Sequence, residues 1–386
     1  MTSFIFLSIF IPGHMYDWGI ERLFVAYVIL MSVCCFITNN KLRSWIKITP
    51  SNIIVICLCL TIICLFGYSR SVIVEVIDTG IRDYFEILRW LIYMIFILFV
   101  ARFFTRRHVA TFTKLLLISL FYSFFVFLLY KVNFPFLSDI FVNSIYLDAK
   151  TWFTSDGYGR LSVPFENPNF LAFYLNLTLV YTIFFMKSSR ITKYTMLVLA
   201  LALLYLTGSR SGWICCLIII FFWVLLNLRL LFTSQRFKAM AYLLIFLVVS
   251  TFCCNLIIHN INSNYRILSL VQAMENGGII SEANLSGRIQ QMKDSWEYTV
   301  ESPFFGWGTA KYSVMQVIDS QYFTWLFRYG LVGSLLILLI MLYLICQLLI
   351  LASSNHRYFM GLLALFSQCI VMLGTGAFLD NFRLFL

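Results

Sequence analysis

The stretch LLYLTGSRSGWICC (203–216) sets one arginine, Arg210, between two apolar runs and flanks it with glycine and serine on both sides. No other charged residue lies within 15 residues of Arg210 in either direction. An apolar run of roughly twenty residues is long enough to cross the hydrocarbon core of a bilayer as a helix. The stretch therefore predicts two membrane-spanning helices, near 194–208 and 212–232, joined by a turn with almost no loop.

The composition extends this prediction to the whole chain. Of its 386 residues, 61% are hydrophobic and only 12% are charged, whereas a soluble protein carries about a quarter charged residues. Only helices and closed barrels satisfy their backbone in lipid, and the apolar runs are continuous rather than alternating, which favours helices. The sequence thus predicts an all-α polytopic membrane protein.

Hydropathy predicts about eleven membrane-spanning segments. The first is short enough to be re-entrant. It also lacks the basic flank and small-residue cleavage site of a signal peptide, so we expect it to be retained. The predicted spans are 3–12, 20–38, 52–68, 87–104, 112–131, 169–186, 194–208, 212–232, 239–258, 322–351 and 356–379.

The placement of lysine and arginine predicts the orientation of the bundle. Counted from a cytoplasmic N-terminus, the even-numbered connections hold 14 of the 28 Lys and Arg residues and none of the 17 Asp and Glu residues. Because short cytoplasmic loops carry an excess of Lys and Arg, these connections are predicted to face the cytoplasm. The net charge of +11 then reflects membrane anchoring, and no basic patch with interleaved aromatics points to nucleic acid. The connections are 39–51, 101–114, 187–193, 229–238 and 352–357.

The chain 1–386 is predicted to form a single integral membrane domain with two long outer connections, 132–168 and 259–321. Loops of this length in a compact protein are usually functional. We therefore expect them to contribute to the site rather than only to cover the bundle.

The second outer loop contains helical patterns of its own. In the segment 284–303 a Ser or Asn cap precedes the helix, and Ile289, Met292 and Trp296 fall on one face. This spacing predicts a short helix outside the membrane.

The sequence SPFFGWG (302–308) follows this predicted helix. It predicts a turn whose glycines allow tight packing. The indole of Trp307 is then either an anchor at the membrane interface or a platform on which a sugar stacks, and we favour the anchor.

Arg210 is expected on the outer turn between its two spans. An arginine in mid-bilayer costs about 2.5–3.5 kcal/mol on insertion scales, and less towards the interface. The small residues around Arg210 let a ligand approach, and a guanidinium grips phosphate well. An isolated arginine would simply snorkel to lipid phosphate. Because Arg160 lies at the end of the first outer loop and Arg288 opens a helix in the second, both on the same side as Arg210, we expect the three arginines to converge on one polyanion.

Metal-ligating residues are sparse in this sequence. The four histidines are far apart, and no aspartates are paired at D-x-D spacing. We therefore expect no metal site and no cofactor.

Four motifs carry a resemblance to a known family. They are GRLSVPFENPN (159–169), LTGSRSGW (206–213), LSGRIQQMKDSWEYTVESPFFGWG (285–308) and DSQYFTWLFRYGLVG (319–333). In this order they resemble the O-antigen polymerase and ligase superfamily of bacterial surface polysaccharide assembly. The first 150 residues match only as generic spans.

The resemblance implies a membrane glycosyltransferase with a GT-C-like bundle and a polyprenyl-diphosphate-linked oligosaccharide as donor and acceptor. The arginines of the family carry over onto Arg160, Arg210 and Arg288 as ligands of the diphosphate. Guanidinium groups can stabilise the charge that develops on such a leaving group without a metal. The resemblance also implies membrane lipid as a partner, with a chain-length regulator and a flippase as candidate protein partners.

Glycosyl transfer also needs a base within hydrogen-bond reach of the acceptor hydroxyl. Ligases of this superfamily have a histidine before the final span, and Asp319 stands at that position here, which favours a polymerase. Asp319 is the first candidate base and Glu166 the second. Alternatively, Asp319 caps the helix that follows it, and Glu166 pairs with Arg160.

The resemblance places the enzyme in the bacterial inner membrane with its active site facing the periplasm. A ligase, which moves the finished chain to lipid A–core, remains an alternative. A flippase for the same lipid-linked sugar would be expected to show internal repeats and mid-span ionisable residues, and neither is evident. A non-enzymatic scaffold would not need an outer arginine cluster.

Overall fold

In the computed structural model, the residues that the structure describes are helical almost throughout. The described residues are 14–15, 18–19, 27, 30, 51–73, 87–88, 90–95, 106–132, 134, 136–137, 140–141, 160–165, 167–228, 283–308 and 320–373. The helices are α4 (Ser51–Ile73), α7 (Arg106–Val132), α9 (Pro168–Val180), α10 (Arg190–Thr207), α11 (Arg210–Leu228), α14 (Ala283–Glu301), α16 (Gln321–Ala352) and α17 (His356–Leu373). A π-helical turn, η3 (Tyr181–Phe185), continues α9, and two two-residue strands, β1 (His14–Met15) and β2 (Trp18–Gly19), pair antiparallel.

Among the described residues, six helices are long and apolar enough to cross a membrane. They confirm the predicted spans 52–68, 112–131, 169–186, 194–208, 212–232 and 322–351, and with them a polytopic helical membrane protein. The last predicted span, 356–379, contains α17. The spans predicted at 3–12 and 239–258 lie outside the described residues, and those at 20–38 and 87–104 are described only in part, so the number eleven stays a prediction.

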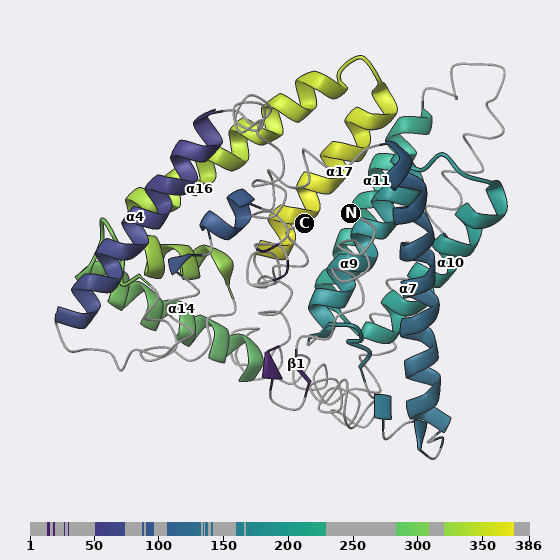
Figure 1. Cartoon of the computed structure of the whole chain (residues 1–386), viewed down its shortest axis with the longest axis horizontal. Helices are drawn as coiled ribbons and strands as arrows, with labels where there is room; N and C mark the ends of the chain where they lie inside the picture. The colour runs from purple at the N-terminus through teal and green to yellow at the C-terminus, as the bar shows by residue number, and fades with distance from the viewer. Residues whose placement is uncertain are drawn as a thin grey trace, which may run out of the picture.

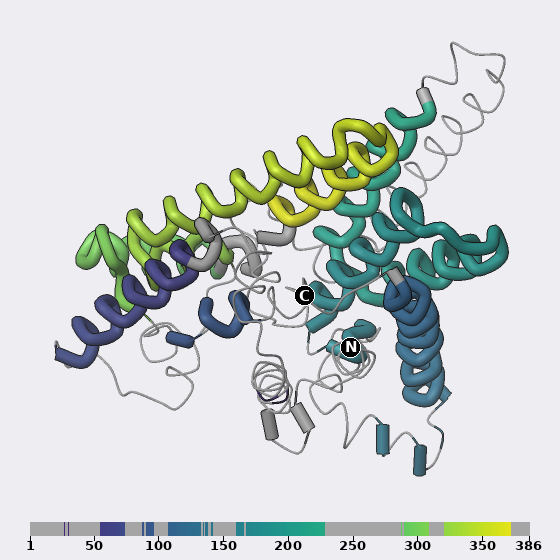
Figure 2. Tube along the Cα trace, turned by 45° about the horizontal axis from the view of Figure 1, so that its top comes forward, coloured from purple at the N-terminus to yellow at the C-terminus, as the bar shows by residue number. Residues whose placement is uncertain are grey.

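The helices form two groups, each with its own hydrophobic core. One core joins α7, α9, α10, α11 and α17, and the other joins α4, residues 87–95 and α16. Figures 1 and 2 show α4, α14 and α16 on one side of the molecule and α7 and α9 to α11 on the other, with α17 between them. The α16–α17 pair connects the two groups because α16 contacts α4 and α17 contacts α11.

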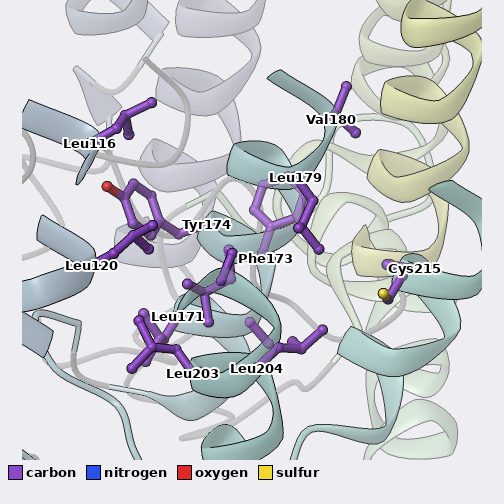
Figure 3. Close-up of a cluster of buried hydrophobic side chains, with 14 of the residues drawn as sticks. Leu116, Leu120, Leu171, Phe173, Tyr174, Leu179, Val180, Leu203, Leu204 and Cys215 are labelled. Atoms are coloured by element: carbon purple, nitrogen blue, oxygen red, sulfur yellow. The ribbon is translucent and has the colours of Figure 1, made fainter. Parts of the chain in front are cut away.

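Helix α9 is the centre of the larger group. Its side chains Leu171, Phe173 and Leu175 are fully buried. Figure 3 shows side chains from α7, α10 and α11 around Leu171 and Phe173. A helix that is apolar on all faces is expected to be buried on all faces. This central position of α9 places its N-terminal end against the α10–α11 turn.

The turn predicted at SPFFGWG (302–308) is present, and it packs against a break in helix α16. At Gly330 the backbone of α16 has φ 62° and ψ −165°, a conformation that is essentially restricted to glycine. Backbone N–H groups of Trp307 and Gly308 donate to the carbonyls of Phe327 and Arg328 at 2.7 and 3.0 Å, and thereby satisfy groups that the break exposes.

Close glycine contacts hold this turn against both α4 and α16. A Cβ on Gly308 would lie 2.4 Å from the backbone N of Tyr68, and one on Gly306 would lie 2.5 Å from the carbonyl O of Phe327. Trp307 is only 4% exposed, and its Nε1 donates to the carbonyl of Tyr298 at 2.6 Å. Both roles considered for Trp307 are therefore wrong, because its indole is a buried packing element rather than an interfacial anchor or an open sugar platform.

Helix α14 confirms the short helix predicted at 284–303, and the structure shows which of its faces is buried. Trp296 is 52% exposed, whereas Ser295 and Thr299 are buried. The hydroxyl of Ser295 donates to the carbonyl of Phe323 at 3.3 Å in α16. The helix thus packs with its small hydroxyl residues, because they allow closer approach to α16 than the larger apolar side chains do.

Candidate functional site

The turn between α10 and α11 consists of only the residues between Thr207 and Arg210. Helix α10 ends at Thr207, Gly208 adopts a left-handed conformation with φ 58°, and α11 begins at Arg210. Glycine is favoured at such a helix end because it has no Cβ to clash. The turn predicted from the sequence is therefore confirmed, and it leaves no room for an intervening loop.

Arg160 lies against this turn. Its Nε donates to the carbonyl of Thr207 at 2.9 Å, and the backbone N of Leu161 donates to the carbonyl of Leu206 at 2.9 Å. The space where Gly208 would carry a Cβ is 3.5 Å from the Arg160 Nε, so the guanidinium lies directly over the glycine. A cation at the C-terminal end of α10 also complements the helix dipole.

Arg210 is the first residue of α11 and is exposed. Within the part of the chain that the structure describes, no hydrogen bond or ion pair occupies its guanidinium. Arg160 and Arg210 therefore flank the same short turn, one held by backbone and the other open to an approaching ligand.

The N-terminal ends of α9 and α11 are tied together at this turn. The Ser209 hydroxyl donates to Asn169 Oδ1 at 2.8 Å and accepts from the backbone N of Gly212 at 3.2 Å. Asn167 caps α9, because its side chain accepts from the backbone N of Asn169 at 2.8 Å. Two helix N-termini with their partial positive charge thus meet beside two arginines, an arrangement suited to an anion.

A buried amide further along α9 reinforces the contact between α9 and the start of α11. Asn176 is fully buried in α9, and its Nδ2 donates to the carbonyls of Ala172 and Gly212, each at 2.9 Å. A Cβ on Gly212 would lie 2.8 Å from the Cβ of Ala172, so α9 and α11 are in close contact here. This amide holds the start of α11 in place against α9.

Of the other predicted site residues, only Arg288 lies in a described helix. Arg288 falls near the start of α14, which packs against α16. Glu166 and Asp319 lie outside the described residues, so their roles and the pairing of Glu166 with Arg160 remain predictions. The N-cap position of α16 is Ser320, whose side chain makes no capping hydrogen bond.

Asn169, Ser209 and Asn176 were not assigned a role from the sequence. Asn169 and Ser209 lie inside the quoted motifs, and Asn176 is an amide within an otherwise apolar span. A polar side chain within a membrane span usually faces the bundle interior, so this signal could have identified Asn176. In the described residues, no group of three or more His, Cys, Asp or Glu side chains could hold a metal ion.

A family model described as O-antigen ligase matches residues 195–338. The matched segment contains Arg210, Arg288 and Asp319, and Arg160 precedes it. No curated protein matches the chain. The match supports the O-antigen polymerase and ligase superfamily and a membrane enzyme of glycosyl transfer, and it does not distinguish a polymerase from a ligase.

Proposed function

We propose that this protein is a surface-polysaccharide polymerase that joins oligosaccharide repeat units carried on a polyprenyl diphosphate. In this reaction an acceptor hydroxyl of one unit attacks the anomeric carbon of the sugar linked to the diphosphate of another. The bond between that carbon and the diphosphate oxygen breaks, and the diphosphate leaves with the electron pair. The growing chain is thereby transferred onto the incoming unit.

One observation carries this proposal. Arg160 and Arg210 both lie at the α10–α11 turn, where the N-termini of α9 and α11 meet. The charge that develops on a leaving diphosphate is stabilised by fixed cations and helix N-termini, and these need little reorganisation during the reaction. Arg160 is already oriented by the carbonyl of Thr207. The turn also lies within the segment that matches the family model.

The remaining roles follow from the sequence and belong to the proposal. Arg288 joins Arg160 and Arg210 on the diphosphate. Asp319 takes the proton from the acceptor hydroxyl, with Glu166 as the second candidate for this role. The residues proposed for catalysis need no metal, since guanidinium groups supply the charge.

The proposal places the reaction at the outer face of a bacterial cytoplasmic membrane, with the N-terminus in the cytoplasm. The donor and acceptor are both lipid-linked oligosaccharides, and a chain-length regulator and a flippase are the expected protein partners. A ligase that transfers the chain to lipid A–core is the second candidate, because the matching family model is described as O-antigen ligase. Asp319 at the position of the ligase histidine favours the polymerase.

The deciding experiment uses the full chain in nanodiscs with one defined polyprenyl-diphosphate repeat unit and separates the products on a gel. We expect a ladder of multiples that is lost in Arg210→Ala and in Arg288→Ala. Arg190→Ala is the matched control, since Arg190 is an exposed arginine at the opposite end of α10 and should leave the ladder unchanged.

The other outcomes each identify a different activity. No ladder, but chain transfer once lipid A–core is added, would establish the ligase. Flipping of a labelled lipid in proteoliposomes without any transfer would exclude a glycosyltransferase. A ladder that survives both arginine substitutions would refute the role of these arginines as diphosphate ligands.

A further inference from the structure

A second cluster of cations lies at the end of the bundle opposite the α10–α11 turn. The π-helical turn η3 ends here, while α10 begins at Arg190 and α17 begins at His356. A helix rises about 1.5 Å per residue, so the 18 residues of α10 separate this end from the turn by roughly 27 Å. The cluster therefore does not belong to the diphosphate site.

Two cations from different helices converge on one backbone oxygen. Lys193 Nζ donates to the carbonyl of Ile183 at 3.4 Å, and Arg357 Nη2 donates to the same carbonyl at 2.6 Å. One cation is enough to complement the C-terminal end of a helix. Two cations at the same oxygen repel each other, and a bound anion would offset this repulsion.

Among the residues that the structure describes, no carboxylate is paired with either of these two cations. The connections 187–193 and 352–357 contain no aspartate or glutamate. Within the described residues, neither Lys193 nor Arg357 forms an ion pair, and both are half-buried. Desolvation makes the excess positive charge here costlier than it would be on an open surface, so an anionic ligand would be correspondingly favoured.

Arg357 is held in place by its own helix and by its neighbours. Asn355 Oδ1 accepts from the backbone N of Arg357 at 3.1 Å and so caps α17. The ring of Tyr358 stacks on that of Phe185 with centroids 5.6 Å apart and an interplanar angle of 19°. A Cβ on Gly361 would lie 2.6 Å from the Cβ of Phe184, so α17 is in close contact with η3. The guanidinium is thus preorganised before any ligand binds.

We propose that Lys193 and Arg357 bind the phosphate of an anionic phospholipid in the leaflet on this side of the membrane. The site lies where the candidate spans Pro168–Phe185 and Arg190–Thr207 meet, which is the depth of the lipid headgroups. Basic pockets between membrane helices on the cytoplasmic side bind anionic headgroups. Ile191 and Tyr194 beside the site are 80% and 64% exposed and offer apolar surface to the rest of the lipid.

The test counts lipid bound to the delipidated full chain by native mass spectrometry, with dioleoylphosphatidylglycerol as the anionic probe and dioleoylphosphatidylcholine as the neutral one. We expect the parent to retain one phosphatidylglycerol in preference to phosphatidylcholine. A cation near a membrane surface contributes about fivefold to binding, so Lys193→Gln/Arg357→Gln should lower the affinity about 25-fold. Lys187→Gln/Arg190→Gln removes the same charge from exposed positions and should lower it less than about fivefold.

Three results would overturn the proposal: no preference for phosphatidylglycerol in the parent, equal losses in the two double variants, or displacement of the lipid by inorganic phosphate at the same concentration. The last of these would assign the site to a soluble anion. If Lys193→Gln/Arg357→Gln does not fold, Lys193→Gln alone decides. A loss of about fivefold supports the site, and an unchanged affinity refutes it. None of these readouts depends on glycosyl transfer.

Discussion

At the scale of single residues, the candidate site depends on a glycine as much as on its arginines. Gly208 has φ 58°, and the Arg160 Nε lies 3.5 Å from the place where a Cβ would stand. The left-handed conformation closes the turn, and the missing side chain leaves the surface on which the guanidinium lies. The left-handed backbone conformation is therefore what favours glycine at this position.

Gly208→Ala should lower the stability of the protein by about 1 kcal/mol, because a non-glycine residue in the left-handed region is strained. It should also weaken transfer activity, since relief of this backbone strain would alter the turn against which Arg160 lies. The thermal-unfolding midpoint in nanodiscs and the initial rate of ladder formation are the two measurements. Normal activity together with a lowered midpoint would show that the position of Arg160 does not matter.

Gly287→Ala is the control for this substitution. A Cβ at Gly287 would meet nothing within 4 Å, and the residue is exposed on a helix. Alanine in a helix is favoured over glycine by roughly 0.5–1 kcal/mol, so this variant should be as stable as the parent or more stable. A midpoint lowered equally in both variants would point to a general sensitivity of the protein to substitution.

At the scale of secondary-structure elements, the break in α16 and the segment 302–308 depend on each other. The backbone N of Leu331 donates to the carbonyl of Pro303 at 2.7 Å, and the backbone N of Val332 donates to that of Phe304 at 3.2 Å. Arg70 at the end of α4 adds a further link, because its Nη1 donates to the Ser302 hydroxyl at 2.6 Å. Three elements far apart in the sequence are thereby joined at one point.

Gly330→Ala should disrupt this junction. Its Cβ would lie 2.4 Å from the carbonyl carbon of Phe304, and the backbone conformation at this residue is essentially restricted to glycine. We expect a loss of about 3 kcal/mol or more, seen as a lowered unfolding midpoint or as failure to elute as a single species in size exclusion. Leu339→Ala, at a side chain on the same helix that is 49% exposed, should change the midpoint little.

At the scale of the whole molecule, the described bundle has two chemically distinct ends. One end carries the α10–α11 turn with Arg160 and Arg210, and the other carries Lys193 and Arg357. The positive-inside rule predicts that the second end faces the cytoplasm. The diphosphate site would then face outward, where lipid-linked repeat units are expected to be joined.

Accessibility of single introduced cysteines tests this orientation. In spheroplasts with an intact cytoplasmic membrane, a membrane-impermeant maleimide should label Arg210→Cys. Lys187→Cys and Ser353→Cys, which are exposed at the opposite end, should be labelled only after the membrane is opened. The parent is the control, because its eleven cysteines are predicted to lie in apolar spans and should stay unlabelled. The reverse pattern would invert the topology.

The sequence by itself determined the membrane class, six of the spans and the tight turn at Arg210, because the partition of apolar runs into lipid is local and additive along the chain. Only the tertiary structure decided which residues meet at that turn. Arg160 and Thr207 are 47 residues apart, and Asn169 and Ser209 are 40 apart. The tertiary structure likewise decided which face of α14 is buried, since Ser295 and Thr299 are buried and Trp296 is 52% exposed. Hydropathy cannot rank the faces of a helix by how closely they pack, since that depends on the shape of the neighbouring helix.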